Sequence, residues 1–188
     1  MPAPHHTLRP ATTASADHLR LLSFTDSQLP HLPPAQWGTE PQLPSPAQRA
    51  KYAALVARAE RSLAWGAPGW ARAYVLEAAS GRAVAMMVLE ARGAEYAEGV
   101  LGREGFVYVR LVVRDRGAGE EGRGSGRVLV GVAEGVAREV GVRRVCLDAW
   151  RGGGGGLVGY YEGLGFRSLG DVEDESGWAA TVLEKRVD

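Results

Sequence analysis

The feature that most constrains the fold is a strand, a glycine-rich segment and a helix in direct succession. Phe106 to Val113 is rich in β-branched and aromatic residues, which favour a buried strand. After the glycine-rich segment Gly117 to Gly126, valines recur every fourth residue at Val128, Val132, Val136 and Val140. This repeat predicts a helix that ends near Gly141 and buries one face. A glycine turn at a helix start exposes backbone N–H groups, so the segment predicts an anion site, most simply for phosphate.

The composition predicts one globular domain over residues 1–188. Hydrophobic residues make up 45% and charged residues 23% of the chain, both ordinary for a folded protein. Because 22 basic residues balance 22 acidic ones, we expect no nucleic-acid partner. We also expect no membrane span, and therefore a cytoplasmic location. Cys146 is the only cysteine and the four histidines are scattered, so no metal site is expected.

The remaining elements alternate between strand and helix patterns. Helices are predicted from the Ser15 cap onward, from Ser45-Pro46 to Gly66, and from Leu157 to Leu164. Short strands are predicted at residues 7–10, 73–78, 85–90, 145–148 and 178–184, with a strand-like start at Gly165-Phe166. Loops are predicted over Pro30 to Pro44 and over Ala91 to Gly105. The order β-α-α-β-β-β-α-β-α-β-β indicates an α/β (α+β) fold with a mixed sheet and helices on both faces.

Three interpretations of the glycine-rich segment compete. Residues 117–122 match the G-x-G-x-x-G spacing of dinucleotide-binding folds, but few residues follow to complete such a sheet. A nucleoside-triphosphate loop needs Gly-Lys-Ser/Thr, which is absent. In the third interpretation, the backbone amides from Gly122 to Arg127, with the side chains of Arg123 or Arg127, hold a pyrophosphate where the helix begins.

At this point the chain resembles the GNAT superfamily of acyl-CoA-dependent N-acyltransferases. That family binds the coenzyme A pyrophosphate at a Gln/Arg-x-x-Gly-x-Gly/Ala turn, and Gly124 and Gly126 fill its two small positions. Glu121 stands where the family has Gln or Arg. A second signature, Tyr-x-x-x-Gly-Phe at a helix end, is matched by residues 161–166. The Asn and Ala usual before it are replaced within Gly152 to Gly156.

The resemblance implies a mostly antiparallel central sheet of six to seven strands flanked by about four helices. It covers residues 73–187, the expected coenzyme A-binding core, and leaves residues 1–70 as a variable acceptor-side part. It implies an N-acetyltransferase that moves the acetyl group of acetyl-CoA directly to a primary amine. The acceptor would be a small molecule or a peptide, and the protein a monomer or homodimer. The alternative is a non-catalytic module of the same fold that binds coenzyme A or a protein partner.

The resemblance also suggests roles for individual residues. For coenzyme A these are the backbone of Val112 and Val113 at the strand end, then Gly122, Arg123, Gly124, Ser125, Gly126 and Arg127. Tyr161 is the expected general acid for the coenzyme A thiolate. The predicted strand before the turn carries no carboxylate, so Glu90, Asp148 or Glu40 is left as the base, unranked. Trp37 and Glu40, in the proline-rich loop, are expected to bind the amine. Each of these residues also has an ordinary structural explanation, as core or surface.

Overall fold

The structure is a computed structural model that describes residues 5–34, 39–175 and 177–188. The chain divides into two compact units, which are described one at a time. The first unit consists of Met1–Leu89 with Leu111–Val130, and the second of Glu90–Arg110 with Gly131–Asp188. The single domain expected over residues 1–188 stays a prediction.

The strands have the order β1-β2-β3-β4-β5-β7-β6. Strand β4 pairs with β5 in parallel, with Val107 opposite Val145. The β1–β2, β5–β7 and β6–β7 pairs are antiparallel. The fold is therefore the mixed, mostly antiparallel α/β sheet that the sequence predicted.

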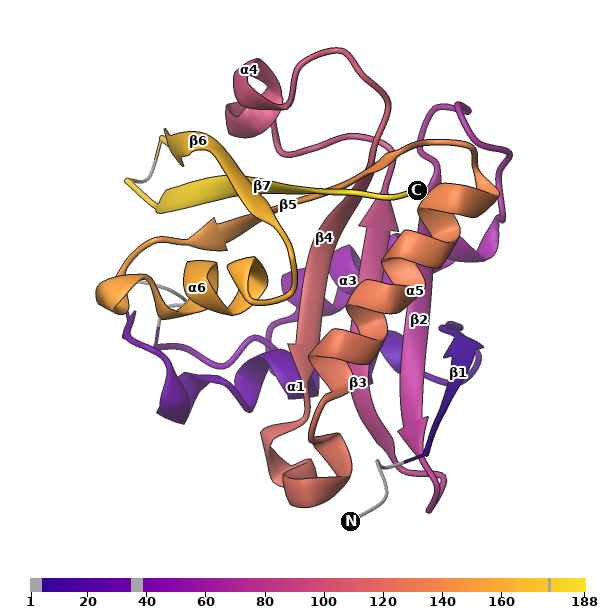
Figure 1. Ribbon diagram of the computed structural model, residues 1–188. Coiled ribbons are helices and arrows are strands. Elements are labelled where there is room, and N and C mark those ends of the chain that lie inside the picture. The colour runs from indigo at the N-terminus through magenta and orange to yellow at the C-terminus, as the bar shows by residue number, and fades with distance from the viewer. Residues whose placement is uncertain (1–4, 35–38, 176) are drawn as a thin grey trace. The chain divides into compact units, whose positions relative to one another are not determined.

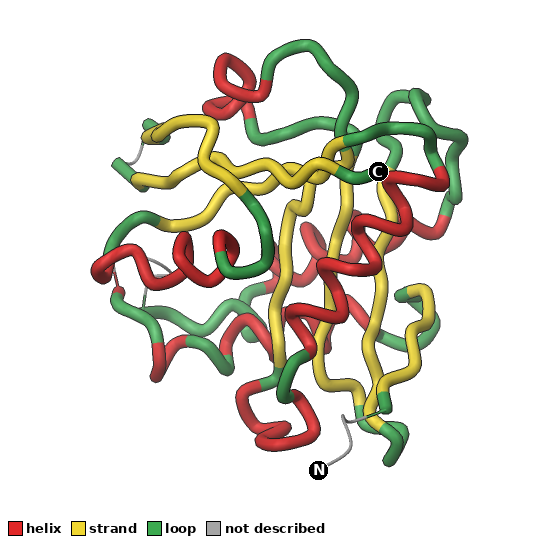
Figure 2. Tube along the Cα trace, viewed as in Figure 1, coloured by secondary structure: helices red, strands yellow, loops and turns green. Residues whose placement is uncertain are grey.

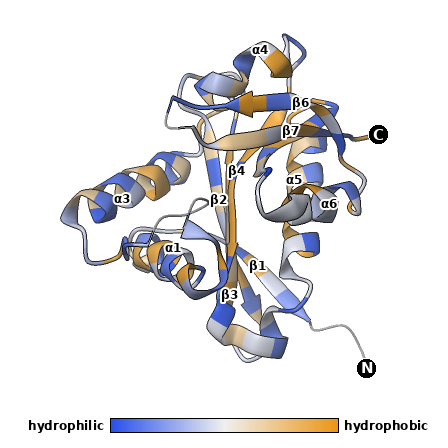
Figure 3. Cartoon of the chain, turned by 90° about the vertical axis from the view of Figure 1, so that its left-hand side faces the viewer, coloured by the Kyte–Doolittle hydropathy of each residue, from blue (hydrophilic) through white to orange (hydrophobic). Residues whose placement is uncertain are grey.

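The first unit is built from the amino-terminal helices and strands. Its elements are β1 (His6–Pro10), α1 (Asp17–Asp26), the 3-10 helix η1 (Leu29–His31), α3 (Pro46–Glu60), β2 (Ala71–Ala78) and most of β3 (Ala83–Glu90). The end of β4 (Val107–Arg114), the 3-10 helix η3 (Arg116–Gly122) and the start of α5 (Ser125–Glu139) complete it. Helix α3 packs against α1 and against β2 (Figures 1 and 3).

The core of the first unit contains apolar side chains from these elements. Its buried residues include Leu21 and Phe24 of α1, Val56 of α3 and Val75 of β2. Ser45 caps α3 as predicted, since its hydroxyl accepts the N–H of Gln48 at 3.4 Å. Helix α3 ends at Glu60 instead of continuing to Gly66.

The predicted start of α1 was wrong. The helix begins at Asp17, and the residue before it is Ala16 in the left-handed conformation, at φ 55°. The buried Asp17 carboxylate accepts the N–H of Thr12 at 2.8 Å and a bidentate pair of bonds from Arg9 at 2.7 and 3.0 Å. The chain before the helix is organised by this buried carboxylate, so Ser15 is not needed as a cap.

The second unit is built around the three carboxy-terminal strands. Its elements are η2 (Glu95–Ala97), α4 (Glu98–Leu101), the start of β4, the end of α5, β5 (Arg144–Trp150), the 3-10 helix η4 (Gly153–Gly155), α6 (Gly156–Glu162), β6 (Arg167–Glu173) and β7 (Ala179–Arg186). Figure 2 shows β5, β6 and β7 as neighbouring strands beside α6. The predicted loop over 91–105 thus contains η2 and α4, two helices too short for the sequence pattern to reveal.

A buried ion pair holds the loop after α4 to this unit. Arg144 donates to Glu184 at 2.6 Å, and the two side chains are each only 5% exposed. The same guanidinium donates to the carbonyl oxygens of Leu101 at 2.9 Å and Glu104 at 3.1 Å. The cost of burying both charges is offset because the guanidinium bonds to the carboxylate and to the two carbonyl oxygens of the loop.

The predicted helix α5 is present, but its buried face differs from the valine repeat. Val128 is 39% exposed, whereas Leu129 and Ala133 are fully buried and Val136 is 6% exposed. A strict four-residue repeat drifts by about 40° per step around a helix of about 3.6 residues per turn, so the four valines span about 120° and Val128, at one edge of that span, is left exposed. The angular position of a residue around the helix axis, and not its being valine, decides whether it is buried.

Candidate functional site

The candidate anion site begins where β4 ends. Val113 is 4% exposed and Val112 is half-buried. Asp115 follows, and its N–H donates to the carbonyl of Val84 at 2.8 Å. Its carboxylate accepts the N–H of Gly117 at 2.8 Å, which caps η3. The chain therefore leaves β4 along a fixed path.

The turn from Gly122 to Ser125 joins η3 to α5. Gly122 is buried, and Ser125, the first residue of α5, is 1% exposed. Gly124 adopts φ +77°, a conformation that strains any side chain, although a Cβ there would meet no atom within 4 Å. The turn thus requires glycine at Gly124 for its backbone shape and leaves the space beside it open.

Three backbone N–H groups lie at the start of α5. Val128 is the first residue whose N–H bonds back, to the carbonyl of Gly124 at 3.2 Å. The N–H groups of Ser125, Gly126 and Arg127 precede it and have no carbonyl acceptor within the helix. Together with the helix dipole they favour a negative charge. The residues predicted to bind coenzyme A, from Gly122 to Arg127, are therefore one continuous turn at a helix start.

The arginine side chains of the turn lie at the surface. Arg123 is 73% exposed and pairs with Glu120, which is 72% exposed, at 2.8 Å. Arg127 is also exposed. An exposed ion pair of this kind contributes about 0–1 kcal/mol, so it does not fix the turn. The backbone amides are the better-defined donors.

Glu121 is held by two other parts of the first unit. Its carboxylate accepts a hydrogen bond of 2.6 Å from the hydroxyl of Ser80, in the turn between β2 and β3. Its carbonyl oxygen accepts one of 2.9 Å from Nε2 of His6 in β1. These contacts join residues 41 and 115 positions apart, and no local sequence pattern marks either of them.

In the second unit, Asp148 of β5 is the centre of a tyrosine cluster. It accepts hydrogen bonds from Tyr96 in η2, at 3.0 Å, and from Tyr108 in β4. Burial, followed by the charge of Asp148, raises the pKa of both phenols, so both stay protonated as donors. Each carboxylate oxygen thus accepts a hydrogen bond from one phenol. The ring of Tyr96 also lies 6.1 Å from that of Trp178.

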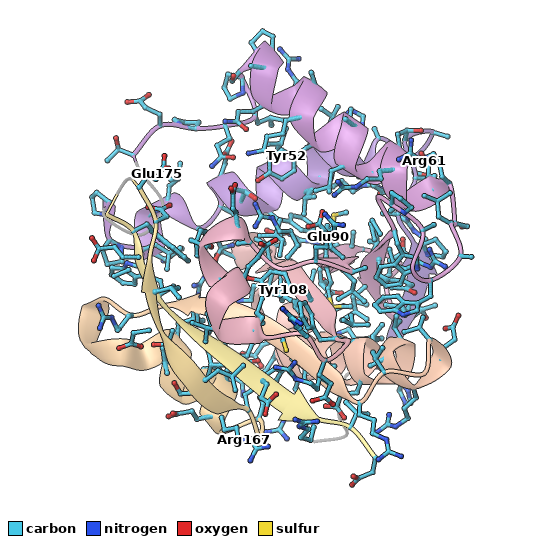
Figure 4. The ribbon with its side chains drawn as sticks, turned by 90° about the horizontal axis from the view of Figure 1, so that it is seen from above. Tyr52, Arg61, Glu90, Tyr108, Arg167 and Glu175 are labelled. Carbon is cyan, nitrogen blue, oxygen red and sulfur yellow. The ribbon has the colours of Figure 1, made fainter. Side chains whose placement is uncertain are left out.

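The tyrosine partners of Asp148 were missed at the level of the sequence. Tyr108 lies opposite Cys146 in the parallel β4–β5 register. Cys146 precedes Asp148 by two residues, so the two lie on the same face of β5. Once that register is known, the contact is expected. Figure 4 labels Tyr108 beside α4, together with Glu90, which is half-buried at the end of β3.

Tyr161 lies in α6, and the geometry explains the Tyr-x-x-x-Gly-Phe signature. Gly165 adopts φ +90°. Its N–H donates to the carbonyl oxygen of Glu162 at 2.9 Å, and the N–H of Phe166 donates to the carbonyl oxygen of Tyr161 at 3.1 Å. This is a Schellman cap, in which the residue after the glycine contacts a side chain in the last turn of the helix. The rings of Tyr161 and Phe166 make that contact, with centroids 5.6 Å apart.

The Tyr161 hydroxyl is suited to hold a proton. The side chain is half-buried, and burial, with smaller contributions from Tyr160 and Asp148, raises the pKa of the phenol. Among the residues that the structure describes, none is found to hydrogen bond this hydroxyl. Leu157 and Leu164 are half-buried like Tyr161, whereas Tyr160 is 45% exposed, which fits residues 157, 161 and 164 lying on one face of the helix.

The two residues predicted to bind the amine are not brought together by any described contact. Trp37 lies outside the described residues, and Glu40 is exposed. Within residues 5–34, 39–175 and 177–188, no group of three or more potential ligands that could hold a metal ion is found. No helix in those same ranges is long and apolar enough to cross a membrane.

No family model matches the sequence, and a search of curated proteins finds no match. Solved structures do match nearly the whole chain. A proposed phosphinothricin N-acetyltransferase matches with a TM-score of 0.66 and 19% identity, over 98% of this chain and 99% of its own. A proposed acetyltransferase from Salmonella typhimurium, solved with its cofactor acetyl-CoA, matches with a TM-score of 0.62 and 17% identity, over 97% and 94%.

A third match is a GNAT-family acetyltransferase from Listeria monocytogenes. It has a TM-score of 0.64 and 12% identity, over 97% of this chain and 95% of its own. The chain therefore has the fold of the GNAT acetyltransferases, as the two sequence signatures implied. At these identities the likeness is one of fold.

Proposed function

We propose that the protein is an N-acetyltransferase that moves the acetyl group of acetyl-CoA directly to a primary amine. The observation that carries the proposal is the turn from Gly122 to Arg127, whose N–H groups at the start of α5 have no carbonyl acceptor within the helix, on a GNAT fold. A pyrophosphate carries the charge that this helix start favours. The space beside Gly124 is open, so the backbone is accessible to a ligand.

In the proposed reaction, the amine nitrogen forms a bond to the thioester carbonyl carbon and the carbon–sulfur bond breaks. The amine loses a proton and the departing thiolate gains one. We assign stabilisation of the carbonyl oxygen to a backbone amide at Val112 or Val113, on the resemblance to the family. Tyr161 is proposed to give the proton to the thiolate, which is consistent with a phenol that stays protonated.

The resemblance to the family also leads us to propose a base and amine-binding residues. Glu90 and Asp148 are the two candidates for the base in the second unit. Asp148 accepts hydrogen bonds from Tyr96 and Tyr108, and either carboxylate could act as the base. Trp37 and Glu40 are proposed to bind the ammonium form of the amine, which a small molecule or a peptide would supply.

The second candidate function is a non-catalytic module that binds coenzyme A or a protein partner. Glu121 in place of Gln or Arg motivated it, because a carboxylate repels phosphates. That carboxylate is bonded to Ser80, which weakens the objection to an enzyme.

Thiol release separates the two functions. The protein is incubated with acetyl-CoA and a panel of primary amines, and free coenzyme A is followed over time. An enzyme releases thiol only when an amine is present and yields the acetylated amine by mass spectrometry. A binding module shows calorimetric binding of coenzyme A without release on any amine, and that outcome would refute the proposed activity.

A further inference from the structure

The carboxylate of Glu121 lies in the chain three residues before Gly124, the residue that opens the candidate anion site. A free carboxylate at a helix start is attracted by the same amides and dipole that would bind a phosphate. It would occupy them itself and repel an incoming anion. A chain with glutamate at this position therefore needs a way to hold the carboxylate elsewhere if the site is to bind pyrophosphate.

The turn between β2 and β3 provides a partner for the carboxylate. The Ser80 hydroxyl donates to Oε1 of Glu121 at 2.6 Å and accepts the N–H of Arg82 at 3.4 Å, so its orientation is fixed from both sides. Gly81 adopts φ +79° and its N–H bonds to the carbonyl of Ala78 at 2.8 Å, which makes the turn tight.

A second contact holds this turn to the chain that precedes the anion site. Arg82 donates to the Asp115 carboxylate at 2.6 Å, the same carboxylate that caps η3. The main chain of Glu121 is fixed separately, by His6. The side chain of Glu121 thus depends on Ser80, whereas its backbone has another anchor.

We propose that Ser80 is a positioning residue for the coenzyme A turn: it holds the Glu121 carboxylate on the β2–β3 turn and keeps it off the amides of α5. The proposal rests on the proposed function, because it assumes that the ligand of the turn is the coenzyme A pyrophosphate. Ser80 itself touches no reacting atom. Its effect is exerted through the charge of Glu121.

A double-mutant cycle tests this role, with coenzyme A binding measured by calorimetry. Ser80→Ala should weaken binding about fivefold, the size expected when a unit charge is released a few ångströms from another charge in water. Glu121→Gln should bind at least as tightly as the wild type. In the Glu121→Gln background, Ser80→Ala should change the dissociation constant less than twofold, because no charge is left to release.

Three controls separate charge from structure. Ser80→Thr keeps the hydroxyl and should bind like the wild type. Pantetheine, which has no pyrophosphate, should bind the wild type and Ser80→Ala equally. His6→Ala removes the backbone anchor, so Glu121→Gln should not restore the coenzyme A affinity that this variant loses.

In turnover assays Ser80→Ala should raise the KM for acetyl-CoA and leave kcat unchanged. Higher salt should shrink the difference in KM between Ser80→Ala and the wild type.

The outcomes distinguish this proposal from the proposed function. If the wild type binds no coenzyme A, the proposed function fails and the role of Ser80 fails with it. If the wild type binds but Ser80→Ala binds equally well, only the role of Ser80 is overturned. An equal loss from Ser80→Ala with and without Glu121→Gln would mean that the serine supports the turn sterically, which also overturns the proposal.

Discussion

Two glycine-rich segments each precede a helix, and the structure uses their glycines in different ways. The first, Gly117 to Gly126, leads into α5, and the second, Gly152 to Gly156, leads into α6. In the first segment the left-handed residues, Gly119 and Gly124, are separate, and a Cβ at either would meet nothing. Side chains from other elements, Ser80 and Arg82 among them, hold this segment in place.

In the second segment the first two glycines, Gly152 and Gly153, lie against the side chain of Trp150. A Cβ at Gly152 would overlap the indole ring of Trp150, the last residue of β5. Gly153, Gly154 and Gly155 are all left-handed, at φ +62°, +78° and +73°, which directs the chain from β5 into α6. Glycine therefore exposes amides in the first segment and makes room for a ring in the second.

The largest expected effect concerns Tyr161, in the helix that follows the second segment. It tests whether this tyrosine is a catalytic acid or only part of the helix cap. Tyr161→Phe keeps the ring contact with Phe166 that completes the helix cap and removes only the hydroxyl. If Tyr161 is the general acid, kcat should fall at least tenfold, since removing such a group typically costs about 10²–10⁴ in rate. The affinity for acetyl-CoA should change little. Pre-steady-state turnover measures the chemical step directly.

Tyr160→Phe is the matched control, because Tyr160 is the neighbouring, more exposed tyrosine of the same helix. It should leave kcat within twofold of the wild type. Undiminished kcat in Tyr161→Phe would leave this tyrosine with the structural role alone, in the Schellman cap.

The next largest effect concerns the first segment. Gly124→Val places a β-branched residue at φ +77°, which costs about 1–3 kcal/mol of strain unless the turn changes shape. A changed turn displaces the N–H groups proposed to bind the pyrophosphate, so the dissociation constant for coenzyme A should rise at least tenfold. The rise in Tm at saturating coenzyme A should shrink accordingly.

Gly135→Val makes the same substitution at an exposed position of α5 that has no positive φ and no atom near its Cβ. It should bind coenzyme A normally and be no less stable, because valine is a better helix former than glycine. Normal binding by Gly124→Val would show that the turn is only a connection between β4 and α5.

The sequence was sufficient for the fold and for the position of the turn because both depend on local patterns. The strand composition of β4, the glycines and the following helix are contiguous, and so is the Schellman cap that underlies the signature around Tyr161. The start of α1 was wrong because the deciding group, the buried Asp17 carboxylate, binds a side chain from β1. No local cap preference contains that information.

The partners of the site residues could not be predicted for the same reason. Ser80 contacts Glu121, and Tyr108 contacts Asp148, across 40 or more positions of the chain. The contact of Tyr108 depends on the β4–β5 register, which a single sequence does not fix, and the contact of Ser80 joins a turn to the 3-10 helix η3 through the tertiary fold. The prediction from the valine repeat of α5 was wrong for a different reason. The repeat was interpreted as marking the buried face of the helix, but its first valine, Val128, is exposed.

The smallest expected effect isolates the packing role of the second segment. Gly152→Ala puts a methyl group into the position of the Trp150 ring, so the ring or the backbone must move. We expect the free energy of unfolding, measured by urea titration, to fall by about 1–3 kcal/mol, as in other overpacked sites. Coenzyme A affinity should stay within twofold, because the substitution leaves the residues of the turn from Gly122 to Arg127 unchanged.

Gly154→Ala provides the comparison that identifies the cause. Gly154 has φ +78° but open space around its Cβ, so alanine there adds backbone strain without overlap. Removing the ring with Trp150→Ala should abolish most of the cost of Gly152→Ala and none of the cost of Gly154→Ala. If Gly152→Ala costs the same with and without the indole ring, then Gly152 serves backbone conformation like its neighbours. The contrast between the two segments would then reduce to which of them exposes its amides.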